Sequence, residues 1–170
     1  MSSTTPSRAE VFPGILRAGL VTAVVDGLFA SALSVFAYGS TVTRLWQGVA
    51  STLLGPGAIG GGPGPAAIGL AMHVGVALGW SAVFMLIVVR SSAVRRVLLS
   101  KGGIVRVAAA YGPFIWMVMS LVVIPTLARR PPAITTRWWI QLLGHIPFVA
   151  VPIAGMIARS VVRSSPERRG

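Results

Sequence analysis

The sequence has no cysteine and few charged residues, and each shortage excludes a class of protein. Without cysteine there is no disulfide, no thiolate metal ligand and no cysteine nucleophile. Only 11% of the residues are charged and 54% are hydrophobic, a composition outside the range of soluble globular domains. We therefore expect most of the chain to lie in a membrane.

Acidic residues are the scarcest group, with 3 Asp and Glu against 15 Lys and Arg, for a net charge of +12. In a soluble protein such an excess would indicate nucleic-acid binding. Here the basic residues lie mainly between and beyond apolar runs, so membrane topology is the simpler cause. We predict a lipid bilayer and no nucleic acid as the surroundings of this chain.

Four apolar runs predict four membrane-spanning helices, at residues 15–37, 66–89, 107–127 and 138–158. The run 66–89 has 24 residues and no formal charge. That length crosses a hydrocarbon layer of ~30 Å at ~1.5 Å per residue. The first run is longer than the usual ~7–15-residue core of a signal peptide and has Asp26 at its centre, so we expect a retained span.

The segments outside the spans have distinct compositions. Residues 1–14 are expected to form a loose N-terminal arm, and residues 159–170 a basic tail. Residues 44–54 have apolar positions at helical spacing, which predicts an interfacial helix with Trp46 at headgroup level, a re-entrant segment being the alternative. Residues 55–65 are almost all glycine and proline and predict a loop. Pro113 and Pro125 inside the third run predict that this span is kinked.

The distribution of Lys and Arg predicts the orientation. The arm with the start of the first run (Arg8 and Arg17), the connection 90–106 and the tail together carry 11 of these residues, and the opposite side carries 4. Basic residues accumulate on the cytoplasmic side of membrane proteins. Both termini are therefore expected in the cytoplasm, with the Gly/Pro loop facing outward.

Polar side chains inside the spans form the candidate site. His73 and His145, the only histidines, each lie seven residues into a span entered from the outer side, at a depth of ~10 Å. Asp26 and Ser120 reach a similar depth on spans that run the opposite way. Gln141 lies one turn before His145 on the same face. We expect these five residues to form one polar band in the outer half of the membrane.

The band has two interpretations. A carboxylate at a helix centre costs ~2.5–3.5 kcal/mol on insertion scales, so Asp26 should face protein or water. It then either handles protons or a small solute, or fixes helix pairing through a hydrogen bond to an imidazole. The spans contain no second carboxylate, which favours the structural interpretation. Trp80 and Trp138 share helical faces with the two imidazoles, so tryptophan emission should report on their charge.

Cofactor binding is a further alternative. Two histidines at equal depth would permit axial ligation of a b-type haem through His73 and His145. A hydrogen-bonded histidine is the commoner role in a buried site. Zinc is weaker still, because two His and one Asp leave no fourth protein ligand. We expect no metal and no resident cofactor.

Small residues recur at four-residue spacing on the second span, at Ala71, Gly75 and Gly79. Such faces let helix backbones approach closely in lipid. We expect this face to pack against a neighbouring helix of the same chain, with homodimerisation as the alternative.

Four pieces of sequence carry a family resemblance: residues 19–25, Met72-His73, the prolines 125, 131 and 132 after Met119, and Leu143-Gly144-His145. In these pieces the chain resembles the YagU-like family of small bacterial inner-membrane proteins. It departs from that family in the Gly/Pro loop between the first two spans. The resemblance implies a bacterial inner membrane and a four-span plan, and it implies no activity and no site residue.

Together these patterns predict an all-α bundle of four spans, up-down-up-down, with one short interfacial helix. The favoured function is a non-enzymatic membrane protein whose Asp/His band handles protons or a small solute. The alternative is a structural or accessory subunit that packs against another copy or a membrane-protein partner through its small-residue face. A haem-bearing electron carrier is the third interpretation.

Overall fold

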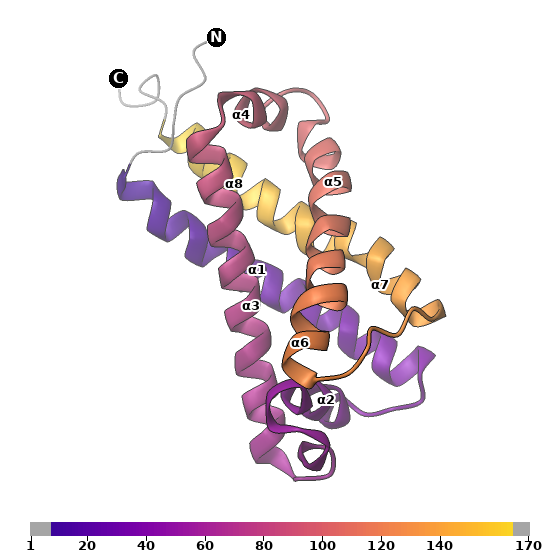
Figure 1. Cartoon of the computed structure of the whole chain (residues 1–170). Coiled ribbons are helices and arrows are strands. Elements are labelled where there is room, and N and C mark those ends of the chain that lie inside the picture. The colour runs from indigo at the N-terminus through magenta and orange to yellow at the C-terminus, as the bar shows by residue number, and fades with distance from the viewer. Residues whose placement is uncertain (1–7, 165–170) are drawn as a thin grey trace.

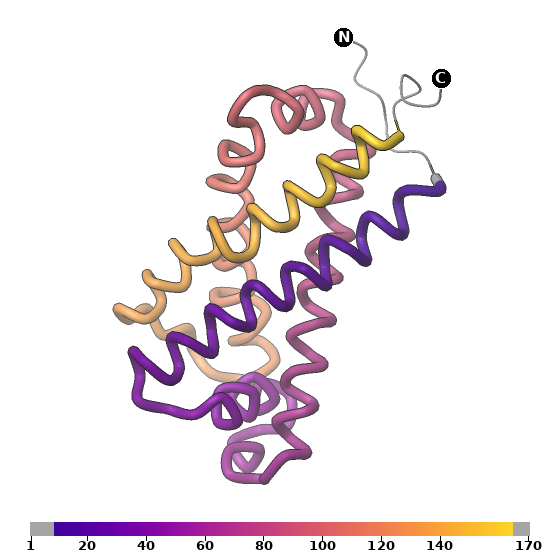
Figure 2. Tube along the Cα trace, turned by 180° about the vertical axis from the view of Figure 1, so that it is seen from behind, coloured from indigo at the N-terminus to yellow at the C-terminus, as the bar shows by residue number. Residues whose placement is uncertain are grey.

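The computed structural model describes residues 8–164, and these residues are helical without any β-strand. Four helices are long and apolar enough to cross a membrane: Ala9–Ala37, Pro63–Arg90, Gly103–Ala128 and Thr136–Arg163. Successive spans run in opposite directions, and the first and last described turns lie side by side at one end of the bundle (Figures 1 and 2). The expected all-α, four-span bundle is confirmed.

Short π-helical turns interrupt the third and fourth spans, and another one ends the first span. The elements in chain order are α1 (Arg8–Ala32), η1 (Leu33–Ala37), α2 (Val42–Leu54), η2 (Pro56–Ala58), α3 (Pro63–Arg90), α4 (Ser92–Leu98), α5 (Gly103–Val118), η3 (Met119–Val123), α6 (Ile124–Ala128), α7 (Thr136–His145), η4 (Ile146–Ala150) and α8 (Val151–Arg163). We call the half of the bundle that carries α4 and the ends of α1 and α8 the terminal half. The half that carries α2 and the connection 129–135 is the loop half (Figure 1).

The first and last spans are longer than the apolar runs predicted. Helix α1 begins at Arg8, so residues 8–14 are not a loose arm, while residues 1–7 lie outside the described part. A Cβ at Gly14 would come within 2.9 Å of the hydroxyl of Ser160 on α8, which shows how closely this turn packs. Helix α8 continues to Arg163, so the basic tail begins as helix, and residues 165–170 again lie outside the described part.

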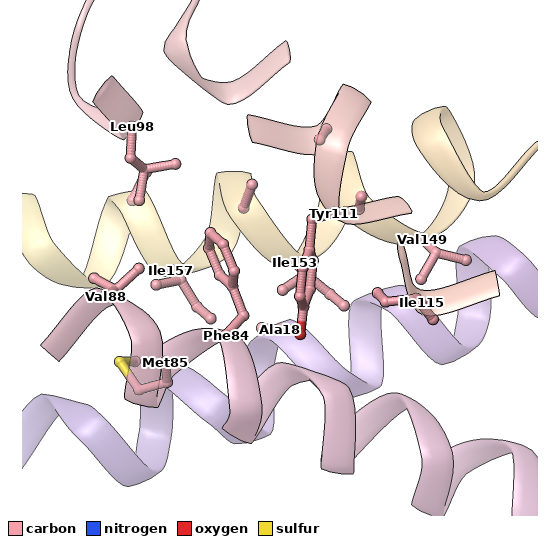
Figure 3. Close-up of a cluster of buried hydrophobic side chains, with 14 of the residues drawn as sticks. Ala18, Phe84, Met85, Val88, Leu98, Tyr111, Ile115, Val149, Ile153 and Ile157 are labelled. Carbon is pink, nitrogen blue, oxygen red and sulfur yellow. The ribbon is translucent and has the colours of Figure 1, made fainter. Parts of the chain in front are cut away.

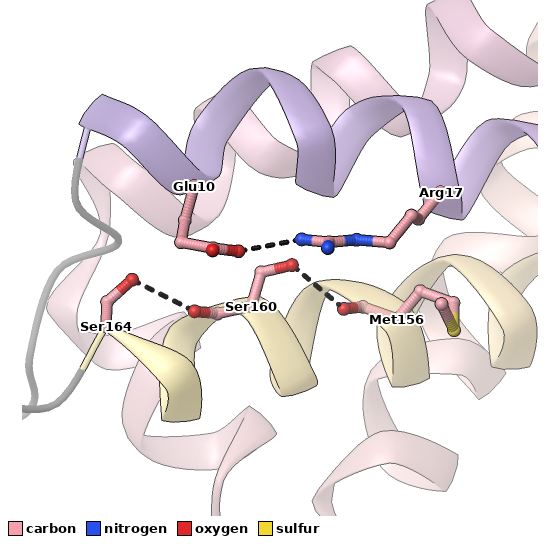
Figure 4. Close-up of polar contacts among 5 residues, drawn as sticks. All are labelled: Glu10, Arg17, Met156, Ser160 and Ser164. Atoms are coloured by element: carbon pink, nitrogen blue, oxygen red, sulfur yellow. Dashed lines mark hydrogen bonds and ion pairs between the residues drawn. The ribbon is translucent and has the colours of Figure 1, made fainter. Parts of the chain in front are cut away.

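Polar contacts line the crossing of α1 and α8 in the terminal half (Figure 4). The guanidinium of Arg17 donates a hydrogen bond to the carboxylate of Glu10, two turns earlier on α1, at 2.7 Å. Opposite them, the Ser160 hydroxyl donates to the Met156 carbonyl at 3.2 Å. These contacts satisfy charged and polar groups close to the end of the spans, where the early start of α1 and the late end of α8 bring them together.

The Gly/Pro segment is shorter as a loop than expected. Helix α3 begins at Pro63, not at residue 66, because proline needs no N–H in the first turn and its φ is preset for a helix. Gln47 holds the remaining loop in place. Its Nε2 donates to the carbonyl of Gly62 at 2.9 Å, and its Oε1 accepts from the N–H of Gly60 at 3.0 Å.

Helix α2 packs into the bundle instead of lying at its periphery. Its N-terminus is capped by Thr41, whose hydroxyl accepts from the N–H of Arg44 at 3.1 Å. A Cβ on Gly69 of α3 would overlap the carbonyl oxygen of Trp46, so the two backbones are in contact there. Trp46 is only 9% exposed, and its ring lies against His73. The sequence predicts the helix over 44–54, but not the burial of the Trp46 ring against α3.

The small-residue face of α3 does not pack against any other part of residues 8–164. Ala71, Gly75 and Gly79 are all exposed, and a Cβ on either glycine would have no neighbour within 4 Å. The intramolecular packing expected for this face is therefore wrong. The close approaches of α3 occur elsewhere, at Gly69 against α2 and at Leu78, whose backbone and side chain crowd Gly19 of α1.

The irregular turns lie near prolines, but not at every proline. The third span is regular at Pro113 and widens into a π-turn over η3, just before Pro125. In the fourth span Pro147 lies within η4. A proline removes one N–H from the helical ladder, and a wider turn is one way to accommodate the loss. Both π-turns fall beside polar residues, Ser120 in η3 and His145 immediately before η4.

The apolar core fills the terminal half (Figure 3). Phe84, Met85 and Val88 of α3 meet Ile153 and Ile157 of α8, and each is at most 2% exposed. The connection after α3 adds an unexpected cap, because Arg95 of α4 folds back and donates to the carbonyls of Val88 and Val89, at 2.6 and 2.9 Å. A hollow of about 1050 Å³ beside this core, between α4, α5 and α8, has no acidic residue and no histidine among the described residues that line it. The ionisable side chains in the middle of the spans lie around a second cavity, in the loop half.

Candidate functional site

A cavity of about 970 Å³ occupies the loop half, between all four spans and α2. Two helices line it with residues spaced four apart, which places them on one face of each helix. These stripes are Thr22, Asp26, Ala30 and Ser34 on the first span, and Arg137, Gln141, His145 and Val149 on the fourth. The residues lining its deep end, such as Thr22 and Ile115, are at most 2% exposed, whereas those at the loop end are exposed. The cavity is therefore blind at mid-bundle and reaches the surface at the loop end.

Asp26 and His73 face each other in this cavity. The Asp26 Oδ2 and His73 Nδ1 atoms are 3.8 Å apart, an ion-pair distance but too long for a direct hydrogen bond. The other ring nitrogen, Nε2, lies 3.0 Å from the carbonyl of Ala23. A carbonyl only accepts, so Nε2 carries the hydrogen and donates it. Nδ1 is then the atom that presents either a lone pair or a proton to the carboxylate.

This geometry implies a shared proton. A neutral imidazole with its hydrogen on Nε2 would point a lone pair at an ionised carboxylate, and the two would repel. One proton, on Nδ1 or on the carboxyl group, removes that repulsion and gives an attractive contact. Both side chains keep about 15% of their surface open to the cavity, so water can reach the pair.

His145 is held in a similar way on the fourth span. Its Nδ1 lies 2.7 Å from the carbonyl of Gln141, one turn earlier, and donates to it. In the neutral ring Nε2 is then the acceptor. Asp26 is close enough to both imidazoles for electrostatic interaction with each. The structure thus brings Asp26, His73, Gln141 and His145 together around one cavity.

Each imidazole lies against a tryptophan from a different helix. The ring of Trp46 is 5.0 Å from that of His73, and the ring of Trp116 is 4.8 Å from that of His145. Gly27 leaves room for the first pair, since a Cβ there would lie 3.5 Å from His73 Nε2. Each imidazole therefore has an indole as a direct neighbour, and that indole comes from another helix.

Sequence spacing indicated different tryptophans, and the reason is geometric. Trp80 and Trp138 share the helices of the histidines, but residues two turns apart on one helix are too far apart for ring contact. Trp80 lines the cavity and packs on Tyr111 and Phe114, while Trp138 packs on Trp116. The ring contacts come from neighbouring helices, and a single sequence gives no signal for those.

Ser120 does not join the site. Its hydroxyl donates to the carbonyl of Trp116 at 2.6 Å and accepts from the indole N–H of Trp138 at 2.9 Å. The residue is buried at the contact between the third and fourth spans and does not line the cavity. Its predicted depth gave no information about its direction, and its role here is to satisfy a buried indole.

Three further polar residues line the cavity that the sequence did not indicate. The hydroxyls of Thr22 and Tyr38 and the indole N–H of Trp116 are buried, and they have no hydrogen-bond partner in the described part of the chain. All three groups can donate a hydrogen bond. Buried polar groups are nearly always paired, so these three donors make the cavity wall the part of the bundle with the most unsatisfied hydrogen-bonding capacity among the described residues.

The arrangement does not favour a haem or a metal ion. Axial ligation needs a nitrogen lone pair directed at the iron. In His73, Nε2 donates a hydrogen bond to the carbonyl of Ala23 and Nδ1 faces the carboxylate of Asp26. Neither nitrogen is therefore available for a haem in this arrangement. Within residues 8–164 no group of three or more His, Asp or Glu side chains is suited to hold a metal ion.

Comparison of the chain with protein-family models, with curated proteins and with solved structures finds no match to any of them. The functional argument therefore depends on the cavity and on the residues that line it.

Proposed function

We propose that this chain is a non-enzymatic, multi-pass protein of the bacterial inner membrane that binds a small solute in its cavity together with a proton at the Asp26–His73–His145 cluster. The observation that carries the proposal is the contact of Asp26 with His73 Nδ1 at 3.8 Å on the wall of a cavity that reaches the surface. The placement in a bacterial inner membrane follows the family resemblance and is part of the proposal.

The cluster supports proton binding because its parts differ from a purely structural ion pair. A structural pair is stabilised by direct hydrogen bonds that satisfy both partners. Here Asp26 accepts no hydrogen bond in the described part of the chain, and its nearest imidazole nitrogen stands off by 3.8 Å. Groups arranged like this are open to water and to a ligand. Ionisable residues inside spans mark solute and proton pathways more often than they mark packing.

The proposed orientation places the mouth of the cavity outside the cytoplasm. The terminal half includes the basic connection 90–106, and the loop half carries only Arg44, Arg129, Arg130 and Arg137. Because basic residues accumulate on the cytoplasmic side, we assign the terminal half to that side. A solute would then enter from the outer side and meet the cluster near the middle of the bundle.

A pair of fusions tests this orientation. Alkaline phosphatase joined after Gly170 should be inactive, because the enzyme folds only outside the cytoplasm, while a fluorescent protein at the same position should be bright. The same phosphatase inserted in the connection 129–135 should be active. High phosphatase activity at Gly170 would contradict the orientation and would place the cavity mouth in the cytoplasm.

Tryptophan emission tests the proton site. We expect the emission of the purified protein to change reversibly between about pH 5 and 8, because imidazole charging in this window alters the indoles beside it. The change should shrink in His73→Leu, through Trp46, and shrink again in His145→Leu, through Trp116. The ring centroids of Trp46 and His73 are 5.0 Å apart, and those of Trp116 and His145 are 4.8 Å apart.

The matched control is Trp139→Phe, which removes an indole that is 55% exposed and remote from both imidazoles in the contacts described. It should lower total emission and leave the size of the pH-dependent change intact. Circular dichroism across the same pH range checks that the helices persist. A flat response in the folded parent protein would contradict proton binding at the cluster.

A structural or accessory subunit is the second candidate, and one observation favours it. The Ala71, Gly75 and Gly79 face of α3 is exposed and contacts nothing else within residues 8–164. Small faces of this kind drive close helix association in lipid. A second copy or another membrane protein could pack there, and such packing is compatible with a solute site in the cavity.

A further inference from the structure

The mouth of the cavity carries most of the positive charge of the loop half. Of the four basic residues there, Arg44, Arg130 and Arg137 line the cavity, and all three are exposed. None of them pairs with a carboxylate in the described part of the chain. The whole sequence offers only Glu10, Asp26 and Glu167 as acids, so the arginines cannot all be neutralised from within the chain.

The arginines are placed by the local structure. Arg137, in the first turn of α7, stacks over the ring of Tyr38 with its guanidinium carbon 4.0 Å from the ring centroid. Arg130 follows Arg129, whose left-handed backbone (φ 50°) ends α6 and turns the chain towards α7. Arg44 lies in the first turn of α2, behind the Thr41 cap. Two connections, one leading into α2 and one between α6 and α7, thus bring three positive residues to the same opening.

Deeper than the arginines, the lining of the cavity is mainly aromatic and aliphatic. Trp46, Trp80 and Trp116 line the cavity together with aliphatic side chains, and the unpaired donors of Thr22, Tyr38 and Trp116 lie around it. Guanidinium groups bind carboxylates and phosphates through paired hydrogen bonds. A ligand that satisfies both zones has a negative head and an apolar body. A volume of about 970 Å³ is at the upper end for a small-molecule site.

We propose that the solute of this cavity is an amphipathic organic anion, whose carboxylate or phosphate head binds Arg44, Arg130 and Arg137 and whose apolar body lies between the tryptophans. This inference rests on the proposed solute site and names its ligand class. The main alternative is a cationic ligand that pairs with Asp26. The three arginines at the mouth disfavour it, because they raise the local concentration of anions and repel cations before they reach Asp26. The head can come from a free organic acid or from an anionic lipid, since both present the same chemistry.

Isothermal titration calorimetry in phosphatidylcholine nanodiscs tests the ligand class. The probes share one eight-carbon chain and differ in the head: octanoate, octyl phosphate, 1-octanol and octyltrimethylammonium. We expect the two anions to bind at one site per chain, at least about tenfold more tightly than the alcohol. The reason is that hydrogen bonds between charged groups are stronger than those between neutral groups. Equal or tighter binding of the ammonium compound would overturn the inference.

Paired substitutions test the arginines. The double variant Arg130→Gln, Arg137→Gln should lower octanoate affinity about tenfold or more. The matched control is Arg90→Gln, Arg96→Gln, which removes two exposed arginines at the opposite end of the bundle and should bind like the parent. If both double variants bind octanoate equally, the mouth does not hold the head and the inference is wrong.

A lipid arm separates the two sources of the anion. Adding phosphatidylglycerol to the nanodiscs should weaken octanoate binding if lipid headgroups compete for the arginines, and should leave it unchanged if the site takes free acids only. Either result supports an anion site. The proposed function fails separately: a parent protein whose emission responds to pH but which binds neither anion keeps its proton site and loses the ligand class.

Discussion

Replacing Gly69 by valine should lower the thermal stability of the protein more than the same change at any other glycine in the middle of α3. A Cβ on Gly69 would overlap the carbonyl oxygen of Trp46, and two further backbone atoms of α2 lie within 3.1 Å. Backbone cannot rotate away as a flexible side chain does, so α2 and α3 must separate. We expect a loss of roughly 3 kcal/mol or more, the upper range for overpacking, measured by thermal unfolding in detergent.

Gly75→Val is the matched control on the same helix. Nothing lies within 4 Å of a Cβ there, so we expect a change of no more than about 0.5 kcal/mol. Parent-like melting of Gly69→Val would mean that α2 does not pack on α3. A shift of Gly75→Val from dimer to monomer in light scattering would instead support the accessory-subunit candidate, in which the exposed small face binds a partner.

The predicted spans and the cavity residues show what one sequence determines. Hydropathy placed all four spans, because crossing a bilayer needs a long uncharged run whatever the tertiary structure. Depth placed Asp26, His73 and His145 correctly near one level, because helical rise is constant and the spans alternate in direction. Both predictions depend only on local geometry along one helix.

The errors concern direction around the helix axis, which depends on neighbouring helices. Ser120 turns toward Trp138 and away from the cavity, and Gly75 lies on a face that meets no other helix in the described part of the chain. In a soluble protein the hydrophobic pattern would separate the inner and outer faces of a helix. In a span both faces are apolar, so that signal is missing.

The span ends were missed for a related reason. Residues 8–14 contain charges and a proline and were assigned to an arm, yet Gly14 packs against Ser160 and the helix begins at Arg8. Pro63 similarly starts α3 because proline is well suited to a first turn. Tertiary packing overrides composition at helix ends, whereas composition dominates in the apolar middle.

Asp26→Asn should remove the pH-dependent tryptophan response almost completely. Within residues 8–164, Asp26 is the only acidic residue that lines the cavity, and the mouth carries three arginines. The protonated form of His73 therefore has one negative charge near it and three positive charges at the mouth of the cavity. Asparagine keeps the size and the polarity of aspartate but removes that negative charge, so imidazole charging loses its main electrostatic support.

Two companion variants make this result specific. Asp26→Glu restores a carboxylate one methylene further out and should recover a pH response, whereas a purely structural role would be sensitive to the longer side chain and indifferent to charge. His73→Leu in the Asp26→Asn background should then change emission at all pH values equally, since no shared proton is left. If Asp26→Asn responds to pH like the parent protein, the carboxylate takes no part in proton binding, and Asp26 serves instead to fix the pairing of α1 with α3 next to the carbonyl of Ala23.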